Sequence, residues 1–548
     1  MTRRAAAGRR AVTGTPPPAG VTGVTSIAVP GIDTPAEAGT RSGWPLRPQH
    51  TDPCPLADLA ELLGLPDRPE GAVTGVTHDS TAVRPGDLYA ALPGRRYHGG
   101  QFAAAAVAAG ARAVLTDPAG AAMVAATDPG VPVLVVDDPR ARLGAVAARV
   151  YGDPTRRLTV IGITGTAGKT TTAYLIEAGL RAAGRTSGLL GTVESRLGDL
   201  VVDSVRTTPE ATDLQALFAV AVERGVQTVV MEVSSHALAL DRVAGVRFTV
   251  GGFTNFGSDH LDFHTDLEDY FAAKARLFDG RCAIEVLNHD DPALRRLRHD
   301  RTITFSASGD PQATWYARDI VSGGPGGDGF RQRFVAVGPD GPLPAGVARP
   351  GRHSVANALL AIAALVAVGV APATAAAGVA AAGDVPGRLE RVGGRNGVLG
   401  VVDYAHKPDA VVAVLAALRP VARARGGRLI CVIGAGGDRD PGKRAPMGEA
   451  AARGADLVVV TDDNPRSEDP AQIRAQILAG ARAAGGAEVR EVPDRREAIR
   501  AAVGAAAPTD VVAVLGKGHE RGQEIAGQVL PFDDREVLAE ALRVVGVR

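Results

Sequence analysis

The stretch Leu158-Thr-Val-Ile-Gly-Ile-Thr164, followed by Gly165-Thr-Ala-Gly-Lys-Thr-Thr171, decides the fold. Residues 158–164 have the apolar, β-branched character of a buried strand, and Thr170–Ala183 follows a helical pattern. A glycine-rich turn between a strand and a helix directs backbone N–H groups toward phosphate oxygens, and the helix N-terminus adds a favourable dipole. The stretch therefore predicts a phosphate-binding loop in an α/β protein.

Within this loop the sequence assigns two side-chain roles. Lys169 is predicted to hold the terminal phosphate oxygens, and Thr170 is predicted to reach Mg²⁺. The general pattern places a glycine five positions before Gly168, where this chain has Ile163. A tight strand–helix turn with a solvated lysine is the alternative interpretation.

Length and composition describe a multidomain globular protein. The chain has 548 residues, which is enough for three to four domains. Apolar residues make up 45% and charged residues 22%, so a packed core is expected. The 60 Lys and Arg balance 60 Asp and Glu, which argues against nucleic acid as a partner because a basic surplus is the usual footprint of such proteins.

Alternating strand and helix patterns predict three α/β modules with mostly parallel sheets covered on both faces. We expect a flexible, disordered tail over residues 1–50 and domains over 51–155, 156–385 and 386–548, with a hinge at Val385–Arg388 and a surface loop at Gly323–Gly329. The predicted strands outside 158–164 are Val73–Val76, Asp87–Leu92, Ala113–Thr116, Val131–Val136, Thr228–Glu232, Phe248–Phe253, Ala283–Asn288, Val398–Asp403, Arg428–Gly434, Leu457–Thr461 and Val511–Leu515. Leu56–Leu65 and Ala103–Ala109 are predicted helices.

The three cysteines and the N-terminus indicate the compartment. Cys54, Cys282 and Cys431 lie far apart without ligand spacing, so we expect a reducing cytoplasm and neither a disulfide framework nor a zinc site. Paired arginines occur near the N-terminus, but no apolar stretch follows them, so we reject an export signal.

One segment, Ser354–Gly383, contains no charged residue and is long enough to span a bilayer. It is rich in alanine and is interrupted by Gly369 and Pro372. Two helices buried in a globular domain therefore fit better than membrane insertion.

Lys274 is predicted to lie on the buried face of a helix. The positions three and four residues away on either side are all large and apolar: Tyr270, Phe271, Leu277 and Phe278. Burial lowers the pKa of a lysine and leaves a neutral, nucleophilic amine. The alternative is that its stem passes the core and the ammonium reaches water. The residues alone leave both possibilities open.

Two candidate metal ligands follow apolar strands. Glu232 ends one strand, and His260 lies just beyond another. Both suit Mg²⁺ only if oxygen atoms complete the coordination shell. A single histidine near an acidic residue is more often a structural hydrogen-bonding group, so that interpretation also stays open.

Three charged, glycine-rich loops follow strands of the third module, namely Gly434–Arg444, Thr461–Arg466 and Gly516–Glu520. Because loops at the carboxyl ends of parallel strands converge, we expect them to share one crevice. Arg466 can bind a carboxylate through two hydrogen bonds, while Asp463 and Glu520 can hold an ammonium. An amino acid would match both charges. The alternative is a set of solvated loops with local turn bonds.

Taken together, the motifs resemble those of the Mur ligase family over about residues 55–545. The resemblance rests on Gly165–Thr171, Glu232-Val-Ser-Ser-His236, Thr254-Asn255, Asp259-His260, Tyr270-Phe-Ala-Ala-Lys274, Asp403-Tyr-Ala-His406, Gly436-Gly-Asp-Arg-Asp440 and Asp463-Asn-Pro-Arg466. It implies a three-domain α/β architecture, with a central P-loop ATPase-like parallel sheet flanked by an N-terminal UDP-binding α/β domain and a C-terminal Rossmann-like domain.

The resemblance also implies an activity, which is ATP-dependent amide-bond formation in peptidoglycan-precursor synthesis. The implied partners are UDP-N-acetylmuramoyl-L-alanyl-D-glutamate and meso-2,6-diaminopimelate, with ATP and Mg²⁺ as cofactors. The γ-phosphoryl group would pass to the D-glutamate side-chain carboxylate, and an amine of diaminopimelate would attack the acyl phosphate. We expect a monomer.

Site residues are carried over position by position. The implied catalytic residues are Lys169, Lys274 and His260, and the metal ligands are Thr170, Glu232, His260 and carbamylated Lys274. The implied ATP contacts are Gly165, Thr166, Ala167, Gly168, Lys169, Thr170, Thr171, Asn288, Asn357, Arg388 and Asp403. Ser80, Thr207, Thr208, Ser234 and Arg242 resemble contacts to the UDP-linked substrate. Arg439, Asp463, Asn464, Arg466, Gly516 and Glu520 resemble the diaminopimelate pocket.

The chain departs from the family pattern at four positions. Ala167 replaces Asn or Lys, Leu240 replaces Gln, Lys407 replaces Thr, and Ser354 replaces Asn. The glycines and lysine of the phosphate loop are intact, so ATP binding is little affected by Ala167. Leu240 puts one substrate contact in question.

Three other functions compete with this interpretation. A folylpolyglutamate-type ligase shares the chemistry, but the uridine-site first module argues against it. A P-loop NTPase switch or motor would hydrolyse nucleotide without an amino acid and would leave the third-module loops unexplained. A non-catalytic UDP-sugar binding protein would have no need of Lys169.

Overall fold

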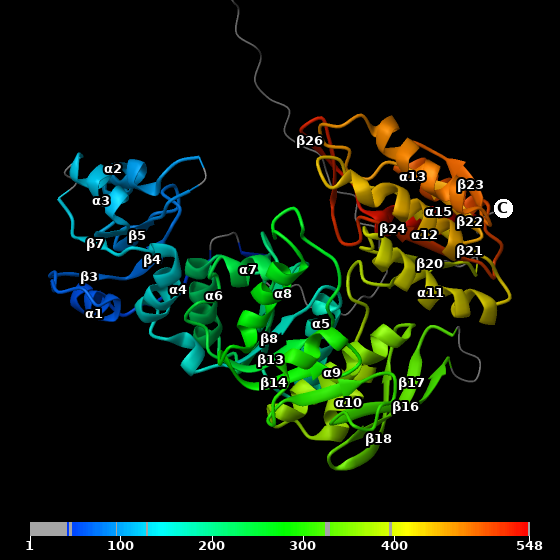
Figure 1. The fold of residues 1–548 in the computed structure, drawn as a ribbon, viewed down its shortest axis with the longest axis horizontal. Coiled ribbons are helices and arrows are strands. Elements are labelled where there is room, and N and C mark those ends of the chain that lie inside the picture. Colours follow the sequence, from blue (N-terminus) through cyan, green and yellow to red (C-terminus); the bar gives the residue numbers. More distant parts are fainter. Residues whose placement is uncertain are drawn as a thin grey trace, which may run out of the picture. The chain divides into compact units, whose positions relative to one another are not determined.

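Three successive α/β sheets form the protein in a computed structural model, which describes residues 41–42, 46–94, 96–127, 130–323, 329–393 and 397–545 (Figure 1). The predicted α/β class is confirmed. Residues 1–40 and 43–45 of the expected tail lie outside the described residues. The expectation is wrong for the end of this segment, because Arg41–Ser42 form a strand and the backbone N–H of His50 donates to Glu223 at 2.8 Å. Residues 324–328 of the predicted surface loop also lie outside the described residues, and the domain boundaries stay a prediction.

The first sheet has four parallel strands in the order β4-β5-β6-β7. They are β4 (Gly75–Thr77), β5 (Asp87–Ala91), β6 (Ala113–Thr116) and β7 (Val133–Val135), with helices α1 (Leu56–Leu63), α2 (Ala103–Ala108), α3 (Pro118–Ala125) and α4 (Pro139–Val150). The predicted strand Val73–Val76 is wrong as a single strand, because its residues belong to two. Residues Ala72–Val73 form β3, which pairs with β2 (Cys54–Pro55), and Thr74 separates it from β4 because its N–H donates to Gly86 O at 2.9 Å.

The central sheet has twelve strands in the order β1-β11-β10-β9-β12-β8-β13-β14-β15-β16-β17-β18. Its parallel part consists of β9 (Ser187–Leu190), β12 (Thr228–Glu232), β8 (Thr159–Thr164), β13 (Phe248–Phe253), β14 (Cys282–Asn288), β15 (Ile303–Ser306) and β16 (Trp315–Ser322). Antiparallel strands that the sequence did not predict extend both edges: β10 (Glu194–Leu197), β11 (Leu200–Asp203), β17 (Gln332–Gly338) and β18 (Gly341–Val347). Strand β1 (Arg41–Ser42) pairs with β11.

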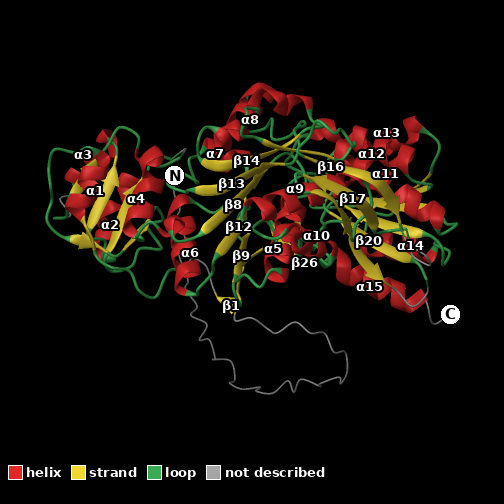
Figure 2. Ribbon diagram, turned by 90° about the horizontal axis from the view of Figure 1, so that it is seen from below, coloured by secondary structure: helices red, strands yellow, loops and turns green. Residues whose placement is uncertain are grey.

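Helices cover both faces of the central sheet because its strands are apolar on both sides (Figure 2). Ile161 and Ile163 of β8 pack into the cluster formed with α5 (Lys169–Ala182), α9 (Arg352–Ala367) and α10 (Pro372–Ala380). Val160 faces the opposite cluster, which includes α6 (Ala211–Glu223) and α7 (Ser235–Ala239). The segment between β13 and β14 carries α8 (Leu267–Ala275).

Most of the uncharged segment Ser354–Gly383 forms α9 and α10 with a short connection between them, as predicted for two buried helices. Leu359, Leu360 and Ile362 of α9 are fully buried in the same cluster as the apolar residues of β8. Along the described ranges, we find no helix that combines the length and the apolar character needed to cross a membrane.

The third sheet has six strands in the order β19-β20-β24-β21-β22-β23, and only the β19–β20 pair is antiparallel. The strands are β19 (Glu390–Gly393), β20 (Leu399–Asp403), β24 (Val511–Leu515), β21 (Leu429–Ile433), β22 (Leu457–Val460) and β23 (Glu488–Glu491). Helices α11 (Pro408–Ala424), α12 (Arg444–Gly454) and α13 (Pro470–Ala484) cover one face, and α14 (Arg495–Gly504) and α15 (Asp534–Val545) cover the other. A separate hairpin, β25 (Gly522–Ile525) and β26 (Gln528–Pro531), precedes α15.

Candidate functional site

The phosphate loop joins β8 to α5, as the sequence predicted. Gly165 has φ 139°, and a Cβ there would lie 1.9 Å from the Thr254 hydroxyl oxygen. Gly168 has φ 87° and immediately precedes α5. Both conformations favour glycine, so the two glycines of the motif are required by backbone geometry as well as by space.

Residues from the next strand hold this loop in place. The Thr254 hydroxyl donates to Ala167 O at 2.6 Å, and Asn255 bonds both the N–H and the carbonyl of Ala167, at 3.1 and 3.0 Å. Asn288 in turn donates its amide to Thr254 O at 2.8 Å. Only backbone atoms of Ala167 take part, which explains why the loop tolerates alanine at this position.

Two lysines converge on one carbonyl group. Lys169 Nζ and Lys274 Nζ donate to Gly165 O at 2.8 and 2.9 Å. Lys274 is only 1% exposed and lies 4.5 Å from the centre of the Tyr270 ring, so its predicted burial is confirmed and the solvent-reaching alternative is wrong. Burial lowers the pKa of both amines, and the charge of Lys169 lowers the pKa of Lys274 further.

Glu232 links the phosphate loop to neighbouring threonines. Its carboxylate accepts hydrogen bonds from the Thr170 hydroxyl at 2.9 Å and from the Thr192 N–H at 2.7 Å. The Thr192 hydroxyl lies 3.1 Å from Glu232 Oε2 and 3.0 Å from the Thr207 hydroxyl. Sequence reasoning missed Thr192. The only local signal was a Gly191-Thr192 pair directly after β9, and its proximity to Glu232, where a Cβ at Gly191 would lie 2.6 Å from Oε1, appears only in the folded chain.

The oxygen atoms of Thr170 and Glu232 suit a hard divalent cation. Mg²⁺ typically takes one or two protein oxygens and completes its shell with water and phosphate oxygens. No group of three or more His, Cys, Asp or Glu side chains that could hold a metal occurs among the residues that the structure describes. The fit therefore depends on Thr170 and Glu232 together with oxygens supplied by a bound nucleotide.

His260 lies in a cluster of charged and aromatic groups. Its Nε2 is 3.2 Å from the Asp259 carboxylate, which also forms an ion pair with Lys407. Its ring packs edge-on against His236, with ring centres 4.7 Å apart. Burial lowers the pKa of His260 to about 3 although Asp259 opposes the shift, so the imidazole is neutral at pH 7. A neutral imidazole can bind a metal, but the observed contacts equally fit a structural hydrogen-bonding role.

Four of the five residues predicted to contact the UDP-linked substrate lie together. The Thr208 hydroxyl donates to Glu232 O at 2.9 Å and accepts from the Ser234 N–H at 3.1 Å, and Thr207 is joined through Thr192. Arg242 pairs with Glu210 at 2.9 Å, a partner that sequence reasoning missed. Ser80 follows β4 and lies beside Tyr89, where burial raises the pKa of the phenol and the Ser80 side chain opposes that shift.

The remaining predicted ATP contacts come from two parts of the chain: Asn357 lies on a helix that covers the central sheet, whereas Arg388 and Asp403 belong to the third sheet region. Asn357 of α9 faces Gly168, where a Cβ would lie 2.6 Å from its amide oxygen. Asp403 ends β20, and its carboxylate accepts the N–H groups of Leu389 at 2.7 Å and Ala405 at 2.8 Å. Burial raises the pKa of Asp403. The Arg388 guanidinium lies 4.6 Å from the centre of the Tyr404 ring.

The three loops of the third sheet do converge. The Gly437 N–H donates to Asn464 O at 2.9 Å, and Arg466 donates to Gly437 O at 2.5 Å. The Asn464 amide donates to the Glu520 carboxylate at 2.9 Å. A Cβ at Gly516 would lie 2.4 Å from Asp463 Oδ2. The predicted convergence of the three loops is therefore confirmed, whereas the ligand crevice that they would share stays a prediction.

Several supporting residues of this pocket escaped sequence reasoning. Lys517 is fully buried and donates to Asn464 Oδ1 at 2.8 Å. Glu524 accepts from Arg466 Nε at 3.2 Å. Arg495 forms a buried bidentate pair with Asp534, both bonds at 2.7 Å. The signal for Lys517 was present in its motif, whereas Glu524 and Arg495 lie in segments without a recognisable pattern.

Arg439 is placed differently from the other predicted pocket residues. It is exposed and lies near Asp438, whose carboxylate accepts from the Ser467 hydroxyl at 2.7 Å. Its position places it at the rim of the converging loops, so its predicted role in ligand binding stays a prediction.

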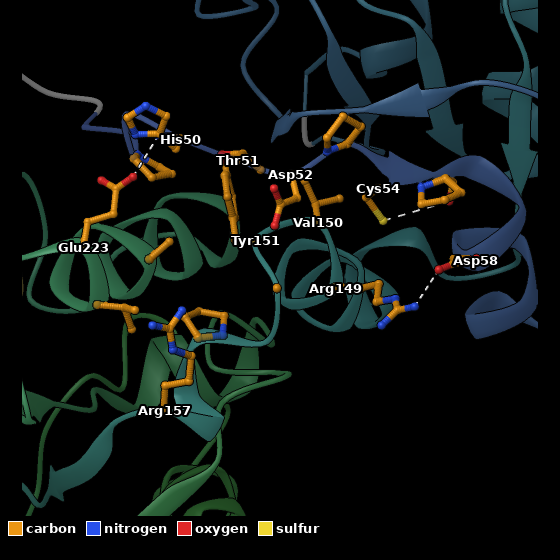
Figure 3. Close-up of a pocket in the computed structure, with 17 residues that line it drawn as sticks. His50, Thr51, Asp52, Cys54, Asp58, Arg149, Val150, Tyr151, Arg157 and Glu223 are labelled. Carbon is orange, nitrogen blue, oxygen red and sulfur yellow. Dashed lines mark hydrogen bonds and ion pairs between the residues drawn. The ribbon is translucent and has the colours of Figure 1, made fainter. Parts of the chain in front are cut away.

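A separate cavity of about 390 Å³ lies between residues 48–58, the end of α4 and the end of α6 (Figure 3). Arg149 and Asp58 pair across one side of it, and His50 bonds Glu223 on the other. It shares no residue with the predicted sites, so the candidate site is defined by the converging loops and not by this cavity.

Most of the chain is similar to known proteins. The chain matches the models described as the Mur ligase family catalytic domain over residues 72–151, the Mur ligase middle domain over 163–365, and the Mur ligase glutamate ligase domain over 387–518. The three matched ranges follow one another along the chain, in agreement with the predicted three-domain architecture.

Curated relatives and a solved structure extend the similarity. Proteins named UDP-N-acetylmuramoyl-L-alanyl-D-glutamate–2,6-diaminopimelate ligase from Streptomyces avermitilis and Streptomyces coelicolor are 56% and 55% identical over 509 residues, which is 91% of this chain and 98% of each relative. A solved structure of a ligase with that name is 31% identical, with a TM-score of 0.64, and the match covers 91% of this chain and 100% of that chain.

Proposed function

This chain belongs to the Mur ligase family, and from that premise we propose that it is an ATP-dependent ligase that adds meso-2,6-diaminopimelate to UDP-N-acetylmuramoyl-L-alanyl-D-glutamate. The amide bond would form at the D-glutamate side-chain carboxylate, in peptidoglycan-precursor synthesis.

One observation carries the proposal. Two sites that differ in charge lie at the carboxyl ends of parallel strands in one chain: the first is basic, and the second carries both acidic and basic side chains. One is a phosphate loop with two buried amines, and the other is a group of converging loops that carries Arg466, Asp463 and Glu520. The first suits a triphosphate and the second suits a zwitterion with an additional carboxylate.

The first chemical step is transfer of the γ-phosphoryl group to the substrate carboxylate. Lys169 and the loop N–H groups would hold and neutralise the phosphate oxygens, so that the carboxylate can attack in line. Arg242, Thr208 and Ser234 would hold the substrate at the neighbouring strand end. The bond between the γ-phosphorus and the bridging oxygen breaks, ADP leaves, and an acyl phosphate results.

Mg²⁺ would be held by Thr170 and Glu232, with His260 and carbamylated Lys274 as further ligands, and when bound it would neutralise charge on the phosphate oxygens. Carbamylation is chemically reasonable at Lys274 because burial favours the neutral amine, which is the form that adds CO₂. The product would be an anionic carbamate next to Lys169 in place of a neutral amine.

The second step is attack by an amine of diaminopimelate on the acyl phosphate, followed by loss of phosphate from the tetrahedral intermediate. Asp463 and Glu520 would bind an ammonium of the incoming molecule and Arg466 a carboxylate. No protein nucleophile is needed. A pocket built around Arg466 would discriminate against L-lysine because that amino acid lacks the second carboxylate that would bind the remaining N–H groups of the guanidinium.

The decisive measurement is phosphate release from ATP in the presence of the UDP-linked dipeptide, with meso-diaminopimelate in one arm and L-lysine in the other. We expect stimulation by diaminopimelate alone. Stimulation only by lysine would reject the substrate assignment. Phosphate release that is the same without an amino acid as with either one would favour an NTPase over a ligase.

A further inference from the structure

The β25–β26 hairpin lies alongside the Asp463–Arg466 loop and belongs to none of the larger sheets. Its first strand pairs with Arg466 through two backbone bonds, from Arg466 N–H to Glu524 O at 3.0 Å and from Ala526 N–H to Arg466 O at 2.7 Å. The Gln523 side chain donates to Asp463 O at 2.9 Å, and the Glu524 N–H donates to Asn464 Oδ1 at 3.0 Å. The hairpin therefore contacts three of the four residues of this loop.

These bonds hold Arg466 in an unfavourable backbone conformation. Its φ is 55°, in the left-handed region that residues with a Cβ rarely adopt. The paired backbone groups of the hairpin stabilise this conformation from one side. The loop thus depends on the hairpin for the direction in which the Arg466 side chain leaves the backbone.

The guanidinium of Arg466 is also fixed at its inner end. Nε donates to Glu524 Oε2 at 3.2 Å, and one terminal nitrogen donates to Gly437 O at 2.5 Å. An arginine has five N–H bonds, so three remain for a ligand. An arginine side chain that is already ordered loses less conformational entropy when a carboxylate binds.

We propose that Glu524 is a positioning residue for carboxylate recognition. It orients Arg466 so that the remaining N–H groups meet the distal carboxylate of the amino-acid substrate, and it thereby contributes to the preference for a diamino diacid over L-lysine. This inference rests on the proposed function and assigns a specificity role to a hairpin that no sequence motif marked.

The experiment compares Glu524→Ala and Glu524→Gln with wild type in the phosphate-release assay. We expect Glu524→Ala to raise KM for diaminopimelate about fivefold, which is the effect of one charge-assisted hydrogen bond at a partly exposed site. The kcat and the KM values for ATP and the UDP-linked dipeptide should stay within twofold. Glu524→Gln keeps an acceptor for Nε and should recover most of the affinity. Gln528→Ala, an exposed side chain on the opposite strand, is the matched control.

A double-mutant cycle with Arg466→Ala tests whether Glu524 acts through Arg466. In that background Glu524→Ala should have no further effect on KM, and thermal unfolding should show that every variant is folded. An unchanged KM, a lower KM, or an effect that persists without Arg466 would each overturn the inference. Wild-type enzyme that ignored diaminopimelate would instead reject the proposed function, and this inference with it.

Discussion

The phosphate loop and the Asp463–Arg466 pocket are built from the same structural element but handle charge in opposite ways. Both lie at the carboxyl ends of adjacent parallel strands. Among the described residues, neither Lys169 nor Lys274 has a carboxylate within ion-pair distance, and both amines share one carbonyl. In the pocket, Lys517 pairs with Glu520 at 3.3 Å and Arg466 with Glu524 at 3.2 Å.

The difference reflects the ligands that the two sites are proposed to bind. A buried amine without an ion-pair partner is costly to protonate, so such a site gains most when a bound polyanion supplies the missing negative charge. A site whose charges are already paired gains less from charge alone and is selective through geometry instead. Affinity for the phosphates and discrimination among amino acids are therefore separable properties, and the following variants test that separation.

The largest effect is expected from Lys169→Ala. Removing the cation that we propose to face the γ-phosphate should lower kcat about 10³-fold, because the proposed role of this charge is to neutralise the transferring group. Binding of diaminopimelate, measured by calorimetry, should be unchanged. Arg181→Ala, an exposed position on the same helix α5, is the control. A loss of less than tenfold would contradict the assigned role.

Arg466→Glu should act on the other site alone. Replacing the cation by an anion should raise KM for diaminopimelate about 100-fold and remove the preference over L-lysine, since a substrate carboxylate that loses its charged partner costs about 2–3 kcal/mol. The affinity for ATP should stay within twofold, as measured by nucleotide titration. Arg482→Glu, at an exposed position on α13, controls for the charge change. Unchanged kinetics for diaminopimelate would refute the pocket assignment.

Lys274→Met should separate stability from activity. It removes a buried amine, so we expect a gain of about 1 kcal/mol in unfolding free energy together with loss of ligase activity. The pKa of Lys274 in the folded state lies below its ordinary value of 10.5. At a pH between these two pKa values, the unfolded state therefore carries one more proton on this amine than the folded state does. The stability of wild type should therefore rise with pH through that window, and the variant should rise less. Thermal unfolding of both proteins at pH 7 and pH 9.5 measures the gain in stability of the variant and the change of stability with pH. An equal change with pH in wild type and variant would contradict burial of an unmodified amine.

The smallest effect is expected from Thr192→Val. This change removes the hydroxyl that lies between Glu232 and Thr207 but keeps the N–H that bonds Glu232. One hydrogen bond should account for about a fivefold loss in kcat/KM for the UDP-linked dipeptide. Thr192→Ser retains the hydroxyl and should behave as wild type. Equal losses in both variants would point to packing instead.

Local pattern was sufficient for the phosphate loop because its requirements are local. Glycines at positions with positive φ, a lysine and a threonine at a helix start can be read from adjacent residues. Helical spacing suggested the burial of Lys274 but left the solvent-reaching alternative open, and only the structure decided between them. Strand Val73–Val76 failed because its two halves pair with different partners, which no local pattern specifies. The antiparallel strands β17 and β18 were missed although they complete an edge of the central sheet.

The sequence by itself determined the α/β class, the phosphate loop and the side chains that carry charge at each strand end. Only the tertiary structure decided which charges meet. Thr192, Glu524 and Arg495 acquire their roles from contacts with residues 15 to 58 positions away along the chain. The physical reason is that a strand's periodicity fixes which face a residue occupies, whereas the order of strands in a sheet fixes its neighbours, and that order depends on packing of the whole sheet.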